Sequence, residues 1–325
     1  MKIITVIVPS YNVEQYLDCT IDSLVKCKNL KDIQVLIVND GSKDSTLQIA
    51  QKHAQQYPES IFVIDKENAG HGSTINAGLA QANGKYLCVI DGDDWVDSDA
   101  FDKLIDKLRD FECDVAISGH YRNYMNDNLE KKFSYNEEAD VLHGLEYLLD
   151  KRYQIPMTDT CYRTSLLKDV NIHIQENTFY VDEEFCTIPY QKVKKVVFTG
   201  LSYYHYRLGN INQSVSPLNM VNRIDHRLRV FDRLFDIYKE ANLSDSAKEY
   251  FTRRLTAIVN TILLIYYVYY PNRKQGRLLA DGFLTKIQSV EGIFVQKSKS
   301  VKSKLLVFNC LHISSSVYNF LKKHF

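Results

Sequence analysis

Short hydrophobic runs alternate with segments of helical spacing through about the first 120 residues of the chain. The runs that predict strands are Ile3–Val8, Val35–Val38, Ile61–Ile64, Tyr86–Ile90 and Asp114–Ser118. The segments between them that predict helices are Val13–Cys27, Asp44–Gln56, Ser73–Gln81 and Ser98–Arg109. Continuous hydrophobic strands that alternate with helices are typical of a parallel sheet covered on both faces. We therefore predict an α/β fold with a mostly parallel central sheet.

Polar clusters follow four of these predicted strands. They are Ser10-Tyr11-Asn12, Asp40-Gly41-Ser42, Asn68 to Gly72, and Asp91-Gly92-Asp93-Asp94. Ligands of open α/β sheets bind beyond the carboxyl ends of the strands, at one edge of the sheet. Because all four clusters fall at such ends, the sequence predicts a ligand site there.

Three carboxylates lie within four residues at Asp91-Gly92-Asp93-Asp94. Hard divalent cations bind oxygen ligands and commonly pair one or two carboxylates with substrate phosphates. Taken alone, this segment is equally well explained as a turn rich in Asp and Gly. An EF-hand is excluded, because the spaced acids and the final Glu of that loop are missing. The position of the segment after a strand favours the cation site.

Asp40 ends the second predicted strand, and its carboxylate could accept a hydrogen bond from an imide or amino group of a base. Tyr11 could stack on the same ring. A helix-capping turn is the structural alternative, although Ser42 and Asp44 could cap a helix without Asp40.

Several function classes are excluded by what the sequence lacks. The glycine-rich loops of dinucleotide-binding and P-loop proteins are absent, as are the hydrolase, zinc-protease and kinase motifs. Forty basic residues balance forty acidic ones, which argues against nucleic-acid binding. The seven cysteines are scattered without a CxxC pair, as expected for thiols in a reducing compartment. We therefore expect a cytoplasmic protein.

Four motifs occur in a familiar order and at familiar spacings. They are Val8-Pro9-Ser10-Tyr11-Asn12, Val38-Asn39-Asp40-Gly41-Ser42, Asn68-Ala69-Gly70 and Asp91-Gly92-Asp93-Asp94. Together they resemble family 2 glycosyltransferases of the GT-A fold, a Rossmann-like α/β fold. The resemblance is close over about the first 120 residues. It implies a nucleotide-sugar donor, usually a UDP-sugar, and a bound Mg²⁺ or Mn²⁺ ion.

The family pattern assigns expected roles to individual residues. By motif position, the residues expected at the nucleotide sugar are Pro9, Tyr11, Asp40, Asn68, Gly70 and Asp91. The resemblance implies that Asp93 holds the metal ion on the diphosphate. A bound cation stabilises the charge that develops on a diphosphate leaving group.

An inverting transfer needs a carboxylate that takes the proton of the acceptor hydroxyl. The segment Val181-Asp182-Glu183-Glu184-Phe185 is similar to the acidic motif that carries this base in the family, and places Asp182 in the base position. Glu183 is the second candidate, because Val181 replaces an acid of the family pattern. Acids at a solvated helix N-terminus are the structural alternative.

Further matches lie at Arg207, Ser214 and Ser216, which resemble the Arg and Ser positions of non-processive members. The planar guanidinium of Arg207 suits a diphosphate, and the two serines could add hydroxyl contacts. His205 ranks below Arg207 as a ligand. The Gln-x-x-Arg-Trp pattern of processive synthases is absent, which favours transfer of one sugar per binding event.

The last third of the chain has a different character. We predict a catalytic domain over residues 1–215 and a helical region over 216–325. The sixteen apolar-rich residues Leu255–Tyr270 are too few to span a bilayer, and predict burial in a core or in an interface between copies of the chain. Six lysines and no acid follow Glu291, so this tail either lies on an anionic membrane surface or packs on the body.

The sequence thus predicts a metal-dependent inverting glycosyltransferase. We expect its acceptor to be a glycan or a lipid-linked glycan of a cell-surface polysaccharide, or alternatively a protein-linked glycan. A nucleotidyltransferase is less favoured, because the segment 9–13 lacks the Gly and Lys of its loop. An inactive nucleotide-sugar-binding module is disfavoured by the intact acidic motifs.

Overall fold

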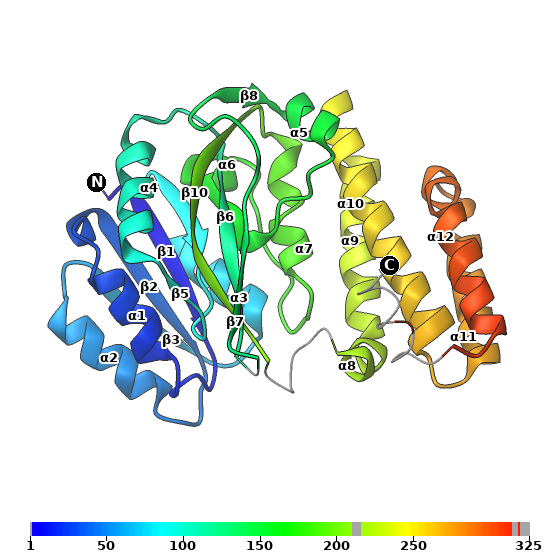
Figure 1. Ribbon diagram of the computed structural model, residues 1–325, viewed down its shortest axis with the longest axis horizontal. Helices are drawn as coiled ribbons and strands as arrows, with labels where there is room; N and C mark the ends of the chain where they lie inside the picture. Colours follow the sequence, from blue (N-terminus) through cyan, green and yellow to red (C-terminus); the bar gives the residue numbers. More distant parts are fainter. Residues whose placement is uncertain (1, 126, 210–215, 314–317, 319–325) are drawn as a thin grey trace. The chain divides into compact units, whose positions relative to one another are not determined.

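The computed structural model describes residues 2–125, 127–209, 216–313 and 318 (Figure 1). The chain divides into two compact units, residues 1–209 and 210–325. The sequence analysis placed the boundary between them after residue 215, which is six residues later than the division after residue 209. Among the described residues, no helix is long and apolar enough to cross a membrane.

Unit 1 is built on one large sheet. Its strands are β1 Ile4–Ser10, β2 Ile33–Asp40, β3 Ile61–Lys66, β4 Tyr86–Val89, β5 Trp95–Val96, β6 Val115–Tyr124, β7 Leu129–Phe133, β8 Leu142–Gly144, β9 Thr160–Arg163 and β10 Lys195–Leu208. Within the described residues their order is β3-β2-β1-β4-β9-β6-β10-β5, with β7 beside β6 and β8 beside β10.

The sheet is parallel only in part. Strands β3, β2, β1 and β4 pair in parallel, because a helix crosses over between each strand and the next in the chain. Further along the sheet, β9 pairs antiparallel with β4 and with β6, while β10 runs parallel to β6. The prediction of a mostly parallel sheet therefore holds for the first four strands. The later strands form a mixed sheet, in which β9 runs antiparallel to both of its neighbours.

Helices cover both faces of this sheet, as predicted. They are α1 Leu17–Val25, α2 Thr46–Gln56, α3 His71–Gln81, α4 Ser98–Asp110, α5 Leu145–Lys151, α6 Thr164–Asp169 and α7 Asp182–Phe185, with short 3₁₀ turns at Leu30–Asp32, Met157–Asp159 and Ile188–Gln191. Buried side chains of α1 and α4 share one cluster with Val6 and Val8 of β1. Helix α3 packs on the opposite face, where Gly78 lies directly against Ile7.

Unit 2 is helical. Its elements are α8 Pro217–Asn222, α9 Ile224–Glu240, α10 Asp245–Leu264, a π-helical turn Ile265–Tyr269, α11 Arg273–Gln288 and α12 Ile293–Cys310. Within the predicted apolar segment 255–270, Leu255, Ile258, Ile262 and Tyr267 are buried, as core packing predicts. The ring of Phe294 on α12 packs edge-on against Phe235 of α9.

Of the basic tail, the structure describes the residues up to 313 and also Tyr318. Its residues 293–310 form helix α12, which is held to the rest of unit 2 by the buried side chains of Phe294 and Leu305. Lys302 forms an ion pair with Asp281 at 3.0 Å. Lys322 and Lys323 lie outside the described residues.

Candidate active site

The polar clusters predicted from the sequence meet at one edge of the sheet, because the adjacent strands β3, β2, β1 and β4 are parallel and end there. The amide of Gly92 donates to the carbonyl of Pro9 at 3.0 Å. A Cβ at position 92 would lie only 2.9 Å from that carbonyl oxygen. Glycine at this position therefore lets the acidic segment pack directly against the end of β1.

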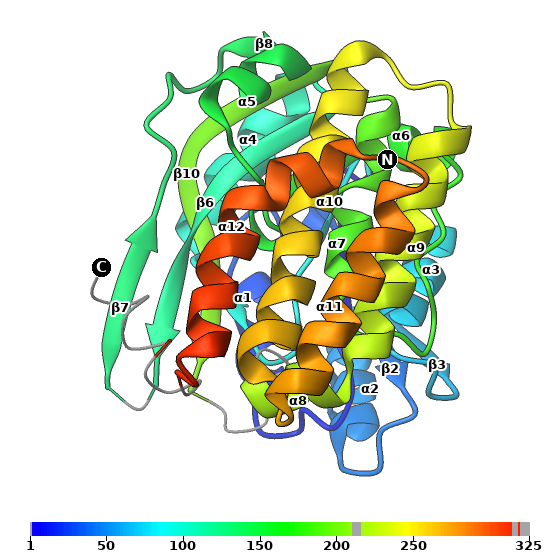
Figure 2. The same cartoon turned by 90° about the vertical axis from the view of Figure 1, so that its right-hand side faces the viewer.

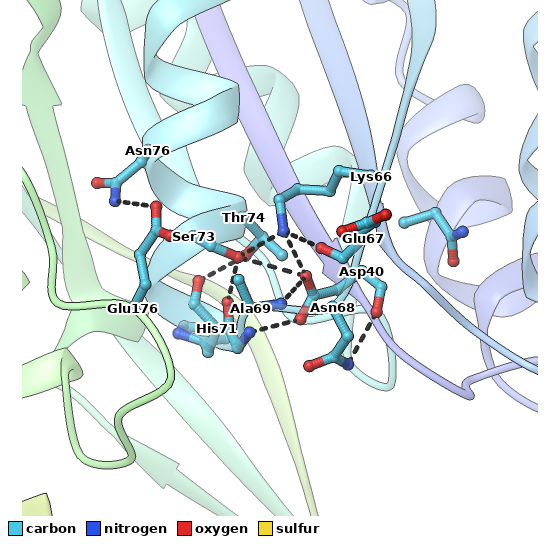
Figure 3. Close-up of polar contacts among 12 residues, drawn as sticks. Asp40, Lys66, Glu67, Asn68, Ala69, His71, Ser73, Thr74, Asn76 and Glu176 are labelled. Carbon is cyan, nitrogen blue, oxygen red and sulfur yellow. Dashed lines mark hydrogen bonds and ion pairs between the residues drawn. The ribbon is translucent and has the colours of Figure 1, made fainter.

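Asp40 is buried at the end of β2, and the chain's own groups bind its carboxylate (Figure 3). The Nζ of Lys66 donates to Oδ1 at 2.7 Å, and the amides of Ala69 and Gly70 donate at 3.0 and 2.9 Å. The side chain of Asn68 donates to the Asp40 carbonyl at 2.8 Å. Asp40 thus organises the loop from Lys66 to Gly70, a structural role that the sequence analysis did not foresee. A contact with a base stays a prediction.

Replacing Asp40 by alanine is expected to lower the free energy of unfolding by about 2–3 kcal/mol, since it removes one partner of a largely buried ion pair and of two amides. Urea unfolding of the ligand-free chain measures this change. Glu59→Ala, which removes an exposed carboxylate just before β3, is the control and should cost less than about 1 kcal/mol. If Asp40→Ala left the stability unchanged but weakened UDP binding, the role of Asp40 would be to bind the nucleobase and not to hold the loop.

The three acids after β4 have different environments. Asp94 is buried and accepts hydrogen bonds from the hydroxyl of Tyr204 at 2.6 Å and from the amide of Arg207 at 2.7 Å. Its carboxylate therefore fastens the acidic segment to β10. Asp91 lies 3.0 Å from Nε2 of His71. Asp91 and Asp93 are partly exposed, so both can meet a ligand.

Asp93 carries a charge that the protein itself compensates poorly. Burial raises the pKa of Asp93 to about 6, and the neighbouring charge of Asp91 adds to the effect. No three His, Cys, Asp or Glu side chains converge as a metal site within the described residues. However, carboxylate oxygens are the ligands that Mg²⁺ and Mn²⁺ prefer, and such sites commonly take further ligands from substrate phosphates. The residues at this position fit a divalent cation.

His71 belongs to the same cluster, and the sequence analysis did not single it out. It is the first residue of α3, which begins two residues earlier than predicted. Burial lowers the pKa of His71, but the hydrogen bond and charge of Asp91, together with the charges of Asp182 and Asp93, raise it overall. These acids therefore favour the protonated imidazolium. The signal available in the sequence was a histidine within a polar cluster at a strand end.

Asp182 is the first residue of α7 and is exposed. Its charge acts on both His71 and Tyr206, so it shares the neighbourhood of Asp91 and Asp93. Tyr180, two residues earlier, has a positive φ of 66°, a conformation that non-glycine residues adopt at a cost and that often marks functional sites. By contrast, Glu184 is fully buried and accepts from the amide of Gln175 at 2.9 Å.

The segment before α7 is docked onto α3. The amide of Asn177 donates to the carbonyl of Ala69 at 2.6 Å. Asn76 exchanges two hydrogen bonds of 2.8 Å with the backbone of Ile174. Gly72 also packs so closely on Gln175 that a Cβ would lie 2.2 Å from its carbonyl oxygen. These contacts bring α7 to the acidic cluster across about a hundred residues of sequence.

Arg207 lies beside the acidic segment, as its predicted role requires. Its Nε donates to the carbonyl of Asp93 at 2.7 Å. The guanidinium carbon lies 4.8 Å from the centre of the Tyr16 ring and 4.7 Å from that of the Trp95 ring. His205 also stacks on Trp95 and, within the described part of the chain, contacts none of Asp91, Asp93 and Asp94.

The remaining predicted residues are less closely grouped. Tyr11 is 51% exposed at the end of β1, whereas Pro9 is buried within it. Ser214 lies outside the described residues. Ser216 belongs to unit 2, where its hydroxyl caps α8 by accepting from the amide of Asn219.

Comparisons with known proteins bear on the fold and the ancestry of the chain. Residues 5–171 match the model of glycosyl transferase family 2. The glycosyltransferase GlyA of Streptococcus pneumoniae is 28% identical over 226 residues, which cover 63% of this chain and 30% of GlyA. This chain thus spans less than a third of that relative's length.

Two solved structures share the fold. TarS residues 1–349 from S. aureus, in complex with UDP-GlcNAc, has a TM-score of 0.63 at 20% identity, and the match covers 96% of this chain and 92% of TarS 1–349. The mannosyltransferase PcManGT of Pyrobaculum calidifontis, in complex with GDP-Man and Mn²⁺, has a TM-score of 0.54 at 12% identity, with 96% and 88% covered. The predicted GT-A type of α/β fold is confirmed.

Proposed function

The chain belongs to glycosyl transferase family 2, and we propose that it transfers one sugar from a UDP-sugar to a hydroxyl of a glycan acceptor, with inversion at the anomeric carbon. The observation that carries this proposal is the acidic cluster at the sheet edge, in which Asp91 contacts His71 and the charges of Asp93 and Asp182 also act on it. Two members of the cluster, Asp93 and His71, have raised pKa values, and perturbed titratable groups of this kind are typical of a catalytic site.

In this proposal Asp182 is the general base. It is exposed, so an acceptor hydroxyl can reach it. Asp182 takes the proton of that hydroxyl as its oxygen attacks the anomeric carbon, and the bond to the diphosphate breaks on the opposite face of the sugar. UDP leaves with the electrons of that bond, and the new glycosidic bond has the inverted configuration.

The leaving diphosphate needs positive charge around it. Asp93 would hold a Mg²⁺ or Mn²⁺ ion, which when bound stabilises the charge on the departing diphosphate. From the chain itself, the guanidinium of Arg207 is fixed beside Asp93 by a hydrogen bond of 2.7 Å. The His71 imidazolium adds a second cationic donor, held by Asp91 at 3.0 Å.

The choice of a UDP-sugar is supported by the UDP-GlcNAc complex of TarS, and the choice of a divalent cation by the Mn²⁺ complex of PcManGT. We propose a glycan or lipid-linked glycan of a cell-surface polysaccharide as the acceptor, with a protein-linked glycan as the alternative. We also propose that the enzyme works in the cytoplasm.

A panel of nucleotide sugars, incubated without acceptor, tests the donor and the cation together. We expect slow release of UDP from at least one UDP-sugar, and we expect EDTA to abolish it and Mn²⁺ or Mg²⁺ to restore it. If EDTA did not change the rate of hydrolysis, the proposed requirement for a metal ion would be wrong. No turnover of any nucleotide sugar, despite UDP binding, would favour an inactive binding module.

Contact between the basic tail and an anionic membrane surface is a separate proposal. Lys299 and Lys304 are exposed on α12. Replacing both by glutamine is expected to weaken binding to phosphatidylglycerol vesicles, by about 1 kcal/mol for each lysine near the surface. Lys302→Gln is the control, since its charge is already paired with Asp281. If the wild-type protein did not bind these vesicles even at low salt, α12 would serve only to pack within unit 2.

A further inference from the structure

A hairpin formed by β6 and β7 extends the sheet of unit 1 beyond β9 and takes no part in the reaction proposed above (Figure 2). Strand β6 pairs with β10 along one edge, and with β9 and then β7 along the other. All five residues of β7 are exposed. In the described part of the chain, β7 pairs with β6 alone.

Three rows of side chains share one face of this part of the sheet, and the outermost is formed by Leu208, Tyr124 and Leu129. Residues opposite each other on neighbouring strands point to the same side. The middle row runs from Tyr206 on β10 to Arg122 on β6 and to Lys131 on β7. His120 and Phe133 form the row on one side of it, and their rings are stacked with centres 5.0 Å apart.

Arg122 is fixed within this surface by its neighbours. Its Nε donates to Nε2 of His120 at 3.3 Å, and its guanidinium carbon lies 4.2 Å from the centre of the Phe133 ring. These contacts use the Nε proton and one face of the guanidinium plane. The terminal nitrogens are left to bind something else, because Arg122 forms no ion pair with an acid anywhere in the described chain.

A buried hydrogen-bond chain holds His120 in the form that Arg122 needs. Nδ1 of His120 lies 2.7 Å from Oδ1 of Asp159, both residues are buried, and the Tyr135 hydroxyl donates to the other oxygen of Asp159 at 2.7 Å. A carboxylate can only accept, so Nδ1 carries the proton and donates it. Nε2 is then the free acceptor for the guanidinium, which can only donate.

The middle row connects to the acidic cluster at one end. Tyr206 neighbours Arg122 across β10 and β6. Burial raises the pKa of the Tyr206 hydroxyl, and nearby carboxylates, with Asp91 the largest and Asp182 among them, raise it further. The hydroxyl of Tyr206 therefore lies in the field of the carboxylates that would carry the reaction. One surface leads from these acids to Arg122 and on to Lys131.

We propose that Arg122 and Lys131 bind an anionic group, a phosphate or a carboxylate, on the acceptor glycan beside the hydroxyl that reacts. This inference rests on the proposed function for the identity of the acceptor as a glycan. Arg122 presents a planar fork that matches either oxyanion. Lys131, exposed and also without an acidic partner in the described chain, adds a second positive charge one strand further out. A neutral acceptor would give neither positive charge an anionic partner.

Binding of defined oligomers to the full chain tests this site. UDP and Mn²⁺ are kept saturating, so that the donor site is blocked. The probes are a poly(glycerol phosphate) oligomer, an oligogalacturonate and a neutral maltooligosaccharide, each titrated by calorimetry. Arg122→Gln and Lys131→Gln are compared with Lys132→Gln. Lys132 is the matched control, because it lies next in the strand on the opposite face, over the ring of Tyr121.

We expect an anionic oligomer to bind the wild type better than the neutral one. Arg122→Gln should weaken that binding by about 10- to 100-fold, the usual cost of losing hydrogen bonds to a charged group. Lys131→Gln should weaken it less, and Lys132→Gln by less than about twofold. Arg122→Lys keeps the charge but loses the fork, and should be intermediate. Preference for the phosphate or the uronate oligomer identifies which anion the acceptor carries.

Equal binding of all three oligomers, or equal losses in Arg122→Gln and Lys132→Gln, would overturn the inference. Acceptor-free hydrolysis of the UDP-sugar is measured on the same proteins and should be unchanged in Arg122→Gln. Hydrolysis without selective anion binding would leave the proposed function standing and remove this site. Anion binding that depends on Arg122, in a chain that hydrolyses no nucleotide sugar, would uphold the anion site and remove the proposed function.

Discussion

Replacing Asp182 by asparagine is expected to lower glycosyl transfer by about 10²- to 10⁴-fold, the usual contribution of a positioned general base. Asparagine has almost the same shape, but its amide cannot take the proton of the acceptor hydroxyl. UDP binding should stay nearly unchanged, because Asp182 lies on α7 rather than at the strand ends. The fluorescence of Trp95 gives a direct measure of that binding. It is the chain's only tryptophan, and it lies 4.7 Å from the guanidinium of Arg207.

Glu183→Gln is the matched control for this prediction, since it removes a carboxylate at the next position of the same helix. The charge of Asp182 acts on His71 and Tyr206, and Glu183 is not among the largest charges that shift their pKa values. We therefore expect Glu183→Gln to retain most of the activity. A large loss in Glu183→Gln with an active Asp182→Asn would place the base one residue later. If Asp182→Asn and Glu183→Gln both lowered the activity only slightly, neither residue of α7 would be the general base.

The edge of the sheet where the polar clusters meet could be predicted from sequence because strand ends in a parallel sheet are aligned. Hydrophobic runs ending at Ser10, Asp40 and Asp91 were enough to bring those residues together. The same alignment pairs Asp40 with Lys66 at the end of β3, but the sequence analysis did not extend the third strand so far. The ion pair that fastens the loop after β3 was missed for that reason.

The division of labour among Asp91, Asp93 and Asp94 could not be predicted from spacing. It depends on β10, which returns to the sheet more than a hundred residues later. The hydroxyl of Tyr204 and the amide of Arg207 on that strand bind Asp94 and bury it. Three identical side chains in one short segment thus have different roles, and only tertiary contacts show which is which. The same holds for Glu184, which is bound internally next to the exposed Asp182.

Asp93→Asn should reduce metal-dependent UDP release to the background and weaken UDP binding in the presence of Mn²⁺. The amide oxygen keeps one weak ligand but loses the negative charge that a hard cation needs. Calorimetric titration of UDP, with and without Mn²⁺, measures the effect. Asp94→Asn is a poor control because Asp94 is buried, so Asp99→Asn, an exposed acid of the first turn of α4, serves instead. UDP binding by Asp93→Asn that still responds to Mn²⁺ would assign the cation to another residue.

The same substitution should make the ligand-free protein more stable, and this gain should depend on pH. The pKa of Asp93 is raised to about 6, mainly by burial, whereas an unfolded aspartate titrates near about 3.9. A group whose folded-state pKa is raised contributes stability below its unfolded pKa and loses that contribution as the pH rises through its folded value. Ionised Asp93 therefore destabilises the folded chain above about pH 6.

Asparagine is neutral at every pH and removes this cost. Thermal unfolding without metal or nucleotide should show Asp93→Asn with a higher Tm than the wild type at pH 8, and the gain should shrink as the pH falls through 6 towards 4. Saturating Mn²⁺ and UDP should reverse the order, because the wild type binds them more tightly and gains more stability from them. An equal Tm at all pH values would mean that Asp93 is already compensated within the protein. Such a stability cost is what we expect of a carboxylate that binds a metal ion in the working enzyme.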